Sequence, residues 1–281
     1  MSDFSHKKRA KIVTIASRKG GVGKTVVTSL LARYYSEIMG KKVLVIDFDP
    51  RAGITSMLYK KPITNQDLTI AEVLEVAFQQ GNIQDAFEQA VKETGLENSK
   101  NWQNTKGKLY LVPAKPALES VLIGKNSSLL KYVLHNLGLS DEYIVLVDSG
   151  SDSNCVIMAT GAADVIFMPL IYSRQDVHPA VETLRTIIME QRGNGRAVLG
   201  GFVINYAGDA QWEQKYHNRY VQIFEDFKKK TEIRVADELH FFRLKPSRTI
   251  KRGSYLDWSF REDYLSVAKQ MAAAVEAVEA L

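Results

Sequence analysis

The sequence predicts an α/β fold of the P-loop NTPase kind, in which a doubly wound, mostly parallel sheet carries helices on both faces. Short, continuous apolar runs alternate along the chain with segments whose apolar residues recur at helical spacing. Such runs are typical of strands buried on both faces of a parallel sheet. A glycine-rich loop joins the first run to the first helical segment. The chain has 281 residues, 45% hydrophobic and 25% charged, so we expect residues 1–281 to form one globular domain.

The first apolar run, residues 12–16, leads into the glycine-rich loop at residues 17–25, and a helical pattern starts near Val26. A β-branched run, glycines and a Lys-Thr pair at the start of a helix are typical of a phosphate-binding loop. There, backbone N–H groups and a helix N-terminus face an anion. The loop therefore predicts a nucleotide site, with the binding residues Lys19, Gly20, Gly21, Val22, Gly23, Lys24, Thr25 and Val26.

The remaining elements follow from hydrophobic periodicity and from signals that start or end helices. The first helix should end at Gly40, and Thr69 and Glu72 have the spacing of a capping box that starts another helix. Strands are expected at residues 43–46, 108–113, 144–148, 165–169 and 198–204, and further helices at residues 83–91, 129–137 and 179–191. This alternation of strand and helix indicates a parallel sheet.

Three aspartates stand where two of the buried strands end. Asp47 and Asp49 follow residues 43–46 and, being two positions apart, point the same way, whereas Asp148 closes residues 144–148. Open α/β sheets bind ligands beyond the carboxyl ends of their strands. We therefore expect the three carboxylates to serve the nucleotide site.

These residue types suit phosphoryl transfer to water, which needs charge neutralisation and alignment more than covalent chemistry. We expect Lys24 to bridge the β- and γ-phosphates and Thr25 to hold Mg²⁺ through its hydroxyl. Asp47 and Asp148 are suited to orienting the waters around Mg²⁺, and Asp49 to positioning the attacking water. On these grounds the expected catalytic residues are Lys24 and Asp49, and the expected metal residues are Thr25, Asp47 and Asp148.

Residues 19–25, Lys-Gly-Gly-Val-Gly-Lys-Thr, resemble the deviant Walker A box of the ParA/MinD superfamily, closest to small ParA-type partition and positioning ATPases. Residues 47–51 resemble the superfamily's D-x-D-P-Q box with Arg51 in place of glutamine, and residues 144–148 resemble a Walker B strand. Residues 149–151, Ser-Gly-Ser, replace the usual Pro-Pro pair. Val26 replaces a second threonine, which predicts a weaker grip on the α-phosphate or compensation by backbone N–H groups.

The resemblance implies an ATP-binding, slow, switch-type ATPase in which Lys19 is a further catalytic residue that crosses a dimer interface to the nucleotide of the partner subunit. ATP would then form the homodimer, and hydrolysis would release it. The resemblance also implies that Asn205, directly after residues 198–204, reads the adenine. The stretch near Leu239 and His240 is the other expected wall, because Arg243 and Leu244 match the Arg-Leu segment of the superfamily.

The net charge of +5 is concentrated between residues 211 and 252, where eleven Lys or Arg stand against six Asp or Glu. Side chains of this kind neutralise phosphates without reading sequence, so this stretch is the expected surface for nonspecific duplex DNA. The resemblance implies a ParB-like or cargo-adaptor partner. The expected DNA-binding residues are Arg192, Arg196, Lys215, Arg219, Arg243, Lys245, Arg248, Lys251 and Arg252.

Two alternatives remain open. A membrane-cycling, MinD-like positioning ATPase would need a basic amphipathic C-terminal helix, but residues 267–281 carry Lys269 as their one cation. A metabolic ligase of the dethiobiotin synthetase kind shares the fold but usually lacks the equivalent of Lys19. Because no apolar run has the length of a membrane span, we expect no membrane partner and a cytoplasmic, nucleoid-associated location. The single cysteine, Cys155, excludes an internal disulfide and, by the resemblance, the iron-sulfur branch.

Overall fold

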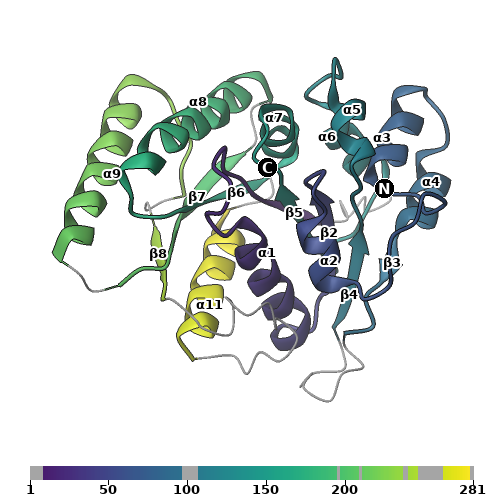
Figure 1. Ribbon diagram of the computed structural model, residues 1–281, viewed down its shortest axis with the longest axis horizontal. Coiled ribbons are helices and arrows are strands. Elements are labelled where there is room, and N and C mark those ends of the chain that lie inside the picture. Colours follow the sequence, from purple (N-terminus) through teal and green to yellow (C-terminus); the bar gives the residue numbers. More distant parts are fainter. Residues whose placement is uncertain are drawn as a thin grey trace, which may run out of the picture.

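The computed structural model describes residues 9–96, 107–194, 197–208, 211–236, 240–245 and 262–278. These residues form an eight-stranded sheet in the order β3-β4-β2-β5-β1-β6-β7-β8 (Figure 1). Neighbouring strands are parallel except for β3, which runs antiparallel to β4. The strands are β1 (Lys11–Ile15), β2 (Lys42–Phe48), β3 (Lys92–Glu93), β4 (Lys108–Val112), β5 (Tyr143–Ser149), β6 (Val165–Leu170), β7 (Val198–Asn205) and β8 (Phe241–Leu244). The predicted doubly wound, mostly parallel sheet is confirmed.

Helices cover both faces of this sheet (Figure 1). One face carries α1 (Lys24–Arg33), which continues as a π-helical turn, η1 (Tyr34–Ile38), together with α2 (Gly53–Leu58) and α11 (Glu262–Ala277). The opposite face carries α3 (Ile70–Phe78), α4 (Ile83–Ala90), α5 (Ala117–Leu122), α6 (Leu129–Asn136), α7 (Ser153–Ala162), α8 (Val177–Asn194) and α9 (Gln211–Lys230). A short 3₁₀ turn, η3 (Arg174–Asp176), precedes α8.

The central strands are apolar on both faces because each face packs against helices. In β2, Leu44 and Ile46 join the core under α3 to α7, whereas Val43 and Val45 join the core under α1 and α11. All four side chains are buried. Alternate residues of one strand thus contribute to two different cores, as the period of two in a strand requires.

The capping box predicted at Thr69 and Glu72 is present in the structure. The hydroxyl of Thr69 accepts a hydrogen bond from the N–H of Ala71 at 3.3 Å, and the carboxylate of Glu72 accepts one from the N–H of Thr69 at 2.8 Å. This capping box starts α3. The predicted strands and helices are present, with α1 starting at Lys24 and α8 extending two residues earlier and three later than expected.

The carboxyl ends of the central strands meet at one edge of the sheet. Ile15 at the end of β1 pairs in register with Asp148 of β5, and Asp148 pairs with Asp47 of β2. The loop after β1, Asp47 and Asp148 near the ends of β2 and β5, and Asn205 at the end of β7 therefore share this edge. None of the helices in the described ranges combines the length and the hydrophobicity that crossing a bilayer requires.

Candidate functional site

The loop between β1 and α1 has the backbone of a phosphate cradle. Gly21 and Gly23 have φ angles of 76° and 91°, which favour glycine. A Cβ on Gly21 would meet nothing within 4 Å, but one on Gly23 would lie 2.5 Å from Nδ2 of Asn205. The same amide group donates a hydrogen bond to the carbonyl oxygen of Val22. Asn205 from β7 thus braces the loop at the N-terminus of α1, where free N–H groups attract anions.

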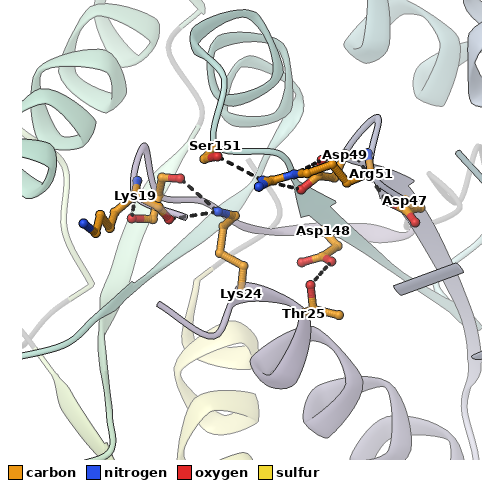
Figure 2. A network of polar contacts seen from close by, with 9 residues as sticks. Lys19, Lys24, Thr25, Asp47, Asp49, Arg51, Asp148 and Ser151 are labelled. Carbon is orange, nitrogen blue, oxygen red and sulfur yellow. Dashed lines mark hydrogen bonds and ion pairs between the residues drawn. The ribbon is translucent and has the colours of Figure 1, made fainter. Parts of the chain in front are cut away.

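Lys24 lies across this loop with only 7% of its surface exposed. Its Nζ donates hydrogen bonds to the carbonyl oxygens of Ser17, at 3.2 Å, and Lys19, at 3.1 Å (Figure 2). Burial lowers the pKa of Lys24, the carboxylate of Asp148 opposes that shift, and the positive charge of Arg51 adds to it. The ammonium group is held where phosphate oxygens of a bound nucleotide can replace the carbonyl oxygens.

Two threonines of α1 hold Asp148. Thr25 Oγ1 donates to Asp148 Oδ2 at 2.8 Å (Figure 2), and Thr28 Oγ1 donates to Asp148 Oδ1 at 2.9 Å. Burial raises the pKa of Asp148 to about 6, although both hydroxyl groups stabilise its charged form. The hydroxyl of Thr25 is therefore fixed next to a carboxylate at the mouth of the loop.

Asp47 lies beside Asp148 on the adjacent strand. Its Oδ2 accepts hydrogen bonds from the N–H and the hydroxyl of Thr55 in α2, at 2.9 and 2.7 Å, and its Oδ1 accepts one from the N–H of Asp49 at 3.1 Å. Burial, followed by the charge of Asp148, raises the pKa of Asp47 to about 7. Two carboxyl groups with raised pKa values thus share one buried edge.

The donor set fits Mg²⁺. This ion prefers oxygen ligands and is usually held through one or two carboxylates, several waters and the phosphates of a substrate. Thr25, Asp47 and Asp148 offer only oxygens, and a cation would relieve the cost of ionising two buried carboxyl groups side by side. Within the described ranges, this site included, no group of three or more His, Cys, Asp or Glu side chains is arranged to hold a metal ion by itself, so Mg²⁺ here would also need waters and phosphate oxygens.

The carboxylate of Asp49 is occupied by Arg51. Arg51 Nε lies 3.1 Å from Asp49 Oδ1, and Arg51 Nη2 lies 3.0 Å from Asp49 Oδ2, so the guanidinium group holds the carboxylate with two hydrogen bonds (Figure 2). Nη2 also donates to Ser151 Oγ at 3.0 Å. These residues, Asp49, Arg51 and Ser151, line a cavity of about 400 Å³. Arg51 and Ser151, which depart from the superfamily's pattern, therefore contact each other.

The two lysines of the loop point to different partners. Lys24 lies on its own loop, whereas Lys19 Nζ lies 3.6 Å from Oδ1 of Asp176 in η3. The side chain of Lys19 is 37% exposed and that of Asp176 only 6%. Asp176 Oδ2 accepts a hydrogen bond from Ser173 Oγ at 2.7 Å. Lys19 is thus held away from the cradle by a buried carboxylate of the same chain.

Arg243 supports the loop that follows Asn205. Its Nη2 lies 2.5 Å from the carbonyl oxygen of Gly208 and 3.4 Å from the carboxylate of Glu213. Both carboxylate oxygens of Glu213 accept hydrogen bonds from the N–H of Gly208. Leu244 pairs in register with Asn205, so β8 lies beside the strand that ends in the expected adenine-reading residue. Leu239, expected in the other wall, lies outside the described residues.

The expected DNA-binding residues fall into three groups. Arg192, Lys215 and Arg219 are exposed on α8 and α9, and within the described ranges none of them is paired with a carboxylate. Arg243 is paired as above, and Lys245 lies 3.9 Å from a carboxylate oxygen of Asp263. Arg196, Arg248, Lys251 and Arg252 lie outside the described residues. Figure 1 shows α8 and α9 together at the β7 and β8 end of the sheet.

Sequence reasoning did not select Arg51, Thr55, Asp176 and Thr28 as site residues. Arg51 carried a signal, since it replaces glutamine in the D-x-D-P-Q box. Thr28 lies one helical turn after Thr25, a spacing that places both hydroxyls on one face of α1. Thr55 and Asp176 reach the site only through the packing of α2 and η3.

Known proteins resemble this chain over most of its length. The family described as "AAA domain" (AAA_31) matches residues 10–194. The sporulation initiation inhibitor protein Soj of Bacillus subtilis is 25% identical to this chain over 276 residues, which cover 94% of this chain and 98% of Soj.

Solved structures share the fold over nearly the whole chain. A Cyanothece McdA variant in complex with ATP matches with a TM-score of 0.69 and 21% identity, covering 98% of this chain and 99% of McdA. A putative plasmid partition protein from Borrelia burgdorferi bound to AMPPNP matches with a TM-score of 0.64 and 22% identity, covering 95% and 98%. Cobyrinic acid a,c-diamide synthase from Mycobacterium smegmatis, with an ATP analogue and magnesium, also has a TM-score of 0.64, at 20% identity and coverages of 92% and 93%.

Proposed function

The chain belongs to the AAA domain family AAA_31, within the ParA/MinD superfamily of P-loop ATPases, and on that basis we propose that it is a Mg²⁺-dependent partition or positioning ATPase. In this proposal ATP joins two copies of the chain into a dimer, and the dimer binds nonspecific duplex DNA. An adaptor protein of the ParB kind connects the dimer to a cargo. Slow hydrolysis of ATP then releases the dimer from DNA.

The residues of the phosphate-binding loop and of the neighbouring strand ends have different roles in hydrolysis. Lys24 binds the β- and γ-phosphates once it leaves the carbonyl oxygens of Ser17 and Lys19. Thr25, Asp47 and Asp148 would hold Mg²⁺ and its waters, and the bound ion would supply neutralisation of the charge that develops on the phosphates. Asp49 positions the attacking water. Asn205 braces the loop at Val22 and contacts the adenine.

The observation that carries the dimeric switch is the separation of the two lysines. A lysine used for its own nucleotide would lie over its own loop, as Lys24 does. Lys19 instead is more than a third exposed and is held by Asp176 beside the loop. Its placement supports a role on the nucleotide of a second copy, where its charge would neutralise phosphate in trans.

The DNA surface is proposed for the outer side of α8 and α9. Arg192, Lys215 and Arg219 are exposed there, and they stand on two helices that pack over β6 and β7. Cations of this kind release counterions from DNA, which gives binding that depends on salt and not on sequence. We leave Arg243 out of this DNA surface and assign it a structural role, because its guanidinium group donates a hydrogen bond to the loop after Asn205.

The packing of α11 favours DNA over a membrane as the surface. Its apolar face, with Val267, Ala268, Met271 and Val275, is buried against α1 and β8. A helix that inserts into a lipid surface needs a free apolar face flanked by cations. The apolar face of α11 is buried in the core and is not exposed for insertion into a lipid surface.

The dimer switch is tested by light scattering coupled to gel filtration. With ATP and Mg²⁺ at low temperature we expect the molar mass of a dimer, and with ADP that of a monomer. Lys24→Ala should bind neither nucleotide and stay monomeric, whereas Lys19→Ala should bind ATP and stay monomeric. A wild-type chain that has the same mass with ATP, with ADP and without nucleotide would overturn the proposal.

A further inference from the structure

Arg51 connects the two loops that follow the aspartate-bearing strands. It stands after β2, holds Asp49 through Nε and Nη2, and reaches Ser151 after β5 (Figure 2). The N–H of Arg51 also donates to Asp49 Oδ1 at 3.0 Å. Both oxygens of Asp49 are therefore engaged, and the carboxylate has little capacity left to orient a water.

The same guanidinium group borders the phosphate cradle. A Cβ on Gly20 would lie 3.9 Å from Arg51 Nη1 and 3.8 Å from Ser151 Oγ. Among the described residues, Nη1 has no hydrogen-bond partner, and the side chain is 66% exposed. A donor of fixed positive charge thus stands next to a glycine of the loop, and its Nη1 can donate to a new acceptor.

Asp49 and a phosphate compete for this donor. A guanidinium group binds a carboxylate or a phosphate through the same pair of parallel hydrogen bonds. A terminal phosphate carries more negative charge than one carboxylate, and Lys24 and the N-terminus of α1 would hold it beside Gly20. An ADP molecule brings no γ-phosphate to that place.

We propose that Arg51 binds the γ-phosphate of the nucleotide in its own subunit and covers Asp49 until that phosphate arrives. Without ATP, Arg51 neutralises Asp49 and ties the loop after β2 to the loop after β5. With ATP, the guanidinium group moves to the γ-phosphate, and Asp49 becomes available to position water. The inference rests on the proposed ATPase function and adds to it a residue that distinguishes ATP from ADP.

A ligand favours one state only to the extent that it binds that state more tightly, so this exchange must appear in the affinities. Loss of a charge-assisted contact made by the γ-phosphate alone should weaken binding of ATP and leave binding of ADP unchanged. Loss of a purely structural link between the two loops would weaken both nucleotides together or neither. The ratio of the two dissociation constants therefore separates the roles.

The test measures binding of a non-hydrolysable ATP analogue and of ADP, each with Mg²⁺, by isothermal titration calorimetry. For Arg51→Gln we expect the analogue to bind about tenfold more weakly and ADP to bind within about twofold of wild type. Arg51→Lys, which keeps the charge but not the fork, should recover part of the loss. Lys61→Gln, which removes an exposed charge outside the site, serves as the matched control and should bind both nucleotides like wild type.

Equal effects of Arg51→Gln on the two nucleotides, or no effect on either, would overturn the role of Arg51. That failure is distinct from failure of the proposed function, because the wild-type titration is read separately. A wild-type chain that binds no adenine nucleotide would refute the ATPase itself. A wild-type chain that binds the analogue, with an unchanged ratio in Arg51→Gln, would refute only the inference.

Discussion

Lys19 Nζ lies 3.6 Å from Oδ1 of Asp176, and within the described part of the chain that oxygen accepts no hydrogen bond. Asp176 is buried, so its charge is poorly hydrated and depends on the ammonium group beside it. Lys19 must leave this carboxylate before it can reach the nucleotide of a second subunit. In the proposed dimer this ion pair must break, and the free energy gained from ATP binding and dimerisation must offset that loss.

We predict that Asp176→Asn lowers the concentration at which the ATP dimer forms, because Lys19 loses its partner in the monomer. The expected change in the dimer dissociation constant is about two- to fivefold, the upper part of the range for an ion pair with an exposed member. Sedimentation velocity with ATP and Mg²⁺ measures it. Asp141→Asn, an exposed substitution before β5, is the control and should dimerise like wild type. A weaker dimer in Asp176→Asn would mean that Asp176 supports the interface.

We predict that Asp49→Ala forms an ATP-bound dimer that hydrolyses ATP slowly. The substitution removes the carboxylate assigned to the attacking water but leaves Lys24, Thr25 and Asp148 in place. A rate of phosphate release at least about tenfold below wild type is expected, since general-base positioning contributes about 10²-fold or more. Light scattering with ATP and Mg²⁺ checks the dimer. A monomer under these conditions would count against the assignment.

The two buried carboxyl groups predict opposite effects of pH on stability and on Mg²⁺ binding. Folding raises the pKa of Asp47 to about 7 and that of Asp148 to about 6 through burial. Between about pH 4 and pH 7 the folded chain binds more protons than the unfolded chain, so the free energy of unfolding should fall as pH rises. Mg²⁺ with nucleotide needs the ionised forms, so its affinity should rise over about pH 6 to 8.

Urea unfolding at a series of pH values, without metal or nucleotide, measures the first effect. The expected loss between pH 5 and pH 8 is on the order of a few kcal/mol. Asp47→Asn should flatten this profile, because an amide does not titrate. A wild-type profile that is as flat as that of the variant would show that Asp47 is ionised throughout this range.

We predict that Lys215→Gln and Arg219→Gln each reduce DNA affinity and lower the slope of log affinity against log salt by about 1, as expected for one phosphate contact. Dimerisation with ATP should be unchanged, because both residues are exposed on α9. Arg243→Gln should instead weaken nucleotide binding, because it releases Gly208 and Glu213. Fluorescence anisotropy of labelled duplex DNA measures the slopes. Loss of the dimer in the α9 variants would move these residues to the subunit interface.

The part of the site that the sequence predicts well is the part that parallel strands bring together. Thr25, Asp47 and Asp148 follow directly from strand ends and the start of a helix, so their proximity needs no knowledge of side-chain packing. Strands β1, β2 and β4 to β7 and helices α1, α3, α4, α6 and α8 follow from hydrophobic periodicity for the same reason, whereas β3, β8, α2, α5, α9 and α11 were not predicted. The helix α7 was not predicted, although Asp152 caps its first turn, because small and polar residues at its start look like a loop.

Contacts between distant loops could not be predicted. Lys19 and Asp176 are far apart in the sequence, and nothing in the turn that holds Asp176 distinguishes it from a surface turn. Arg51 and Ser151 stand out separately as unusual residues, yet only the packing of the loops after β2 and β5 joins them. The charge of the basic stretch at residues 211–252 can be counted from the sequence. The pairing of Arg243 with Glu213, which occupies one of these cations, could not be predicted from it.

The central claim is that ATP controls binding to DNA, and co-sedimentation with a long, nonspecific DNA duplex tests it most directly. The chain would be incubated with Mg²⁺ and either ATP, ADP or no nucleotide, at several salt concentrations. The account predicts that the chain sediments with DNA in ATP alone and that added salt releases it steeply. Equal sedimentation with ATP, with ADP and without nucleotide would contradict it.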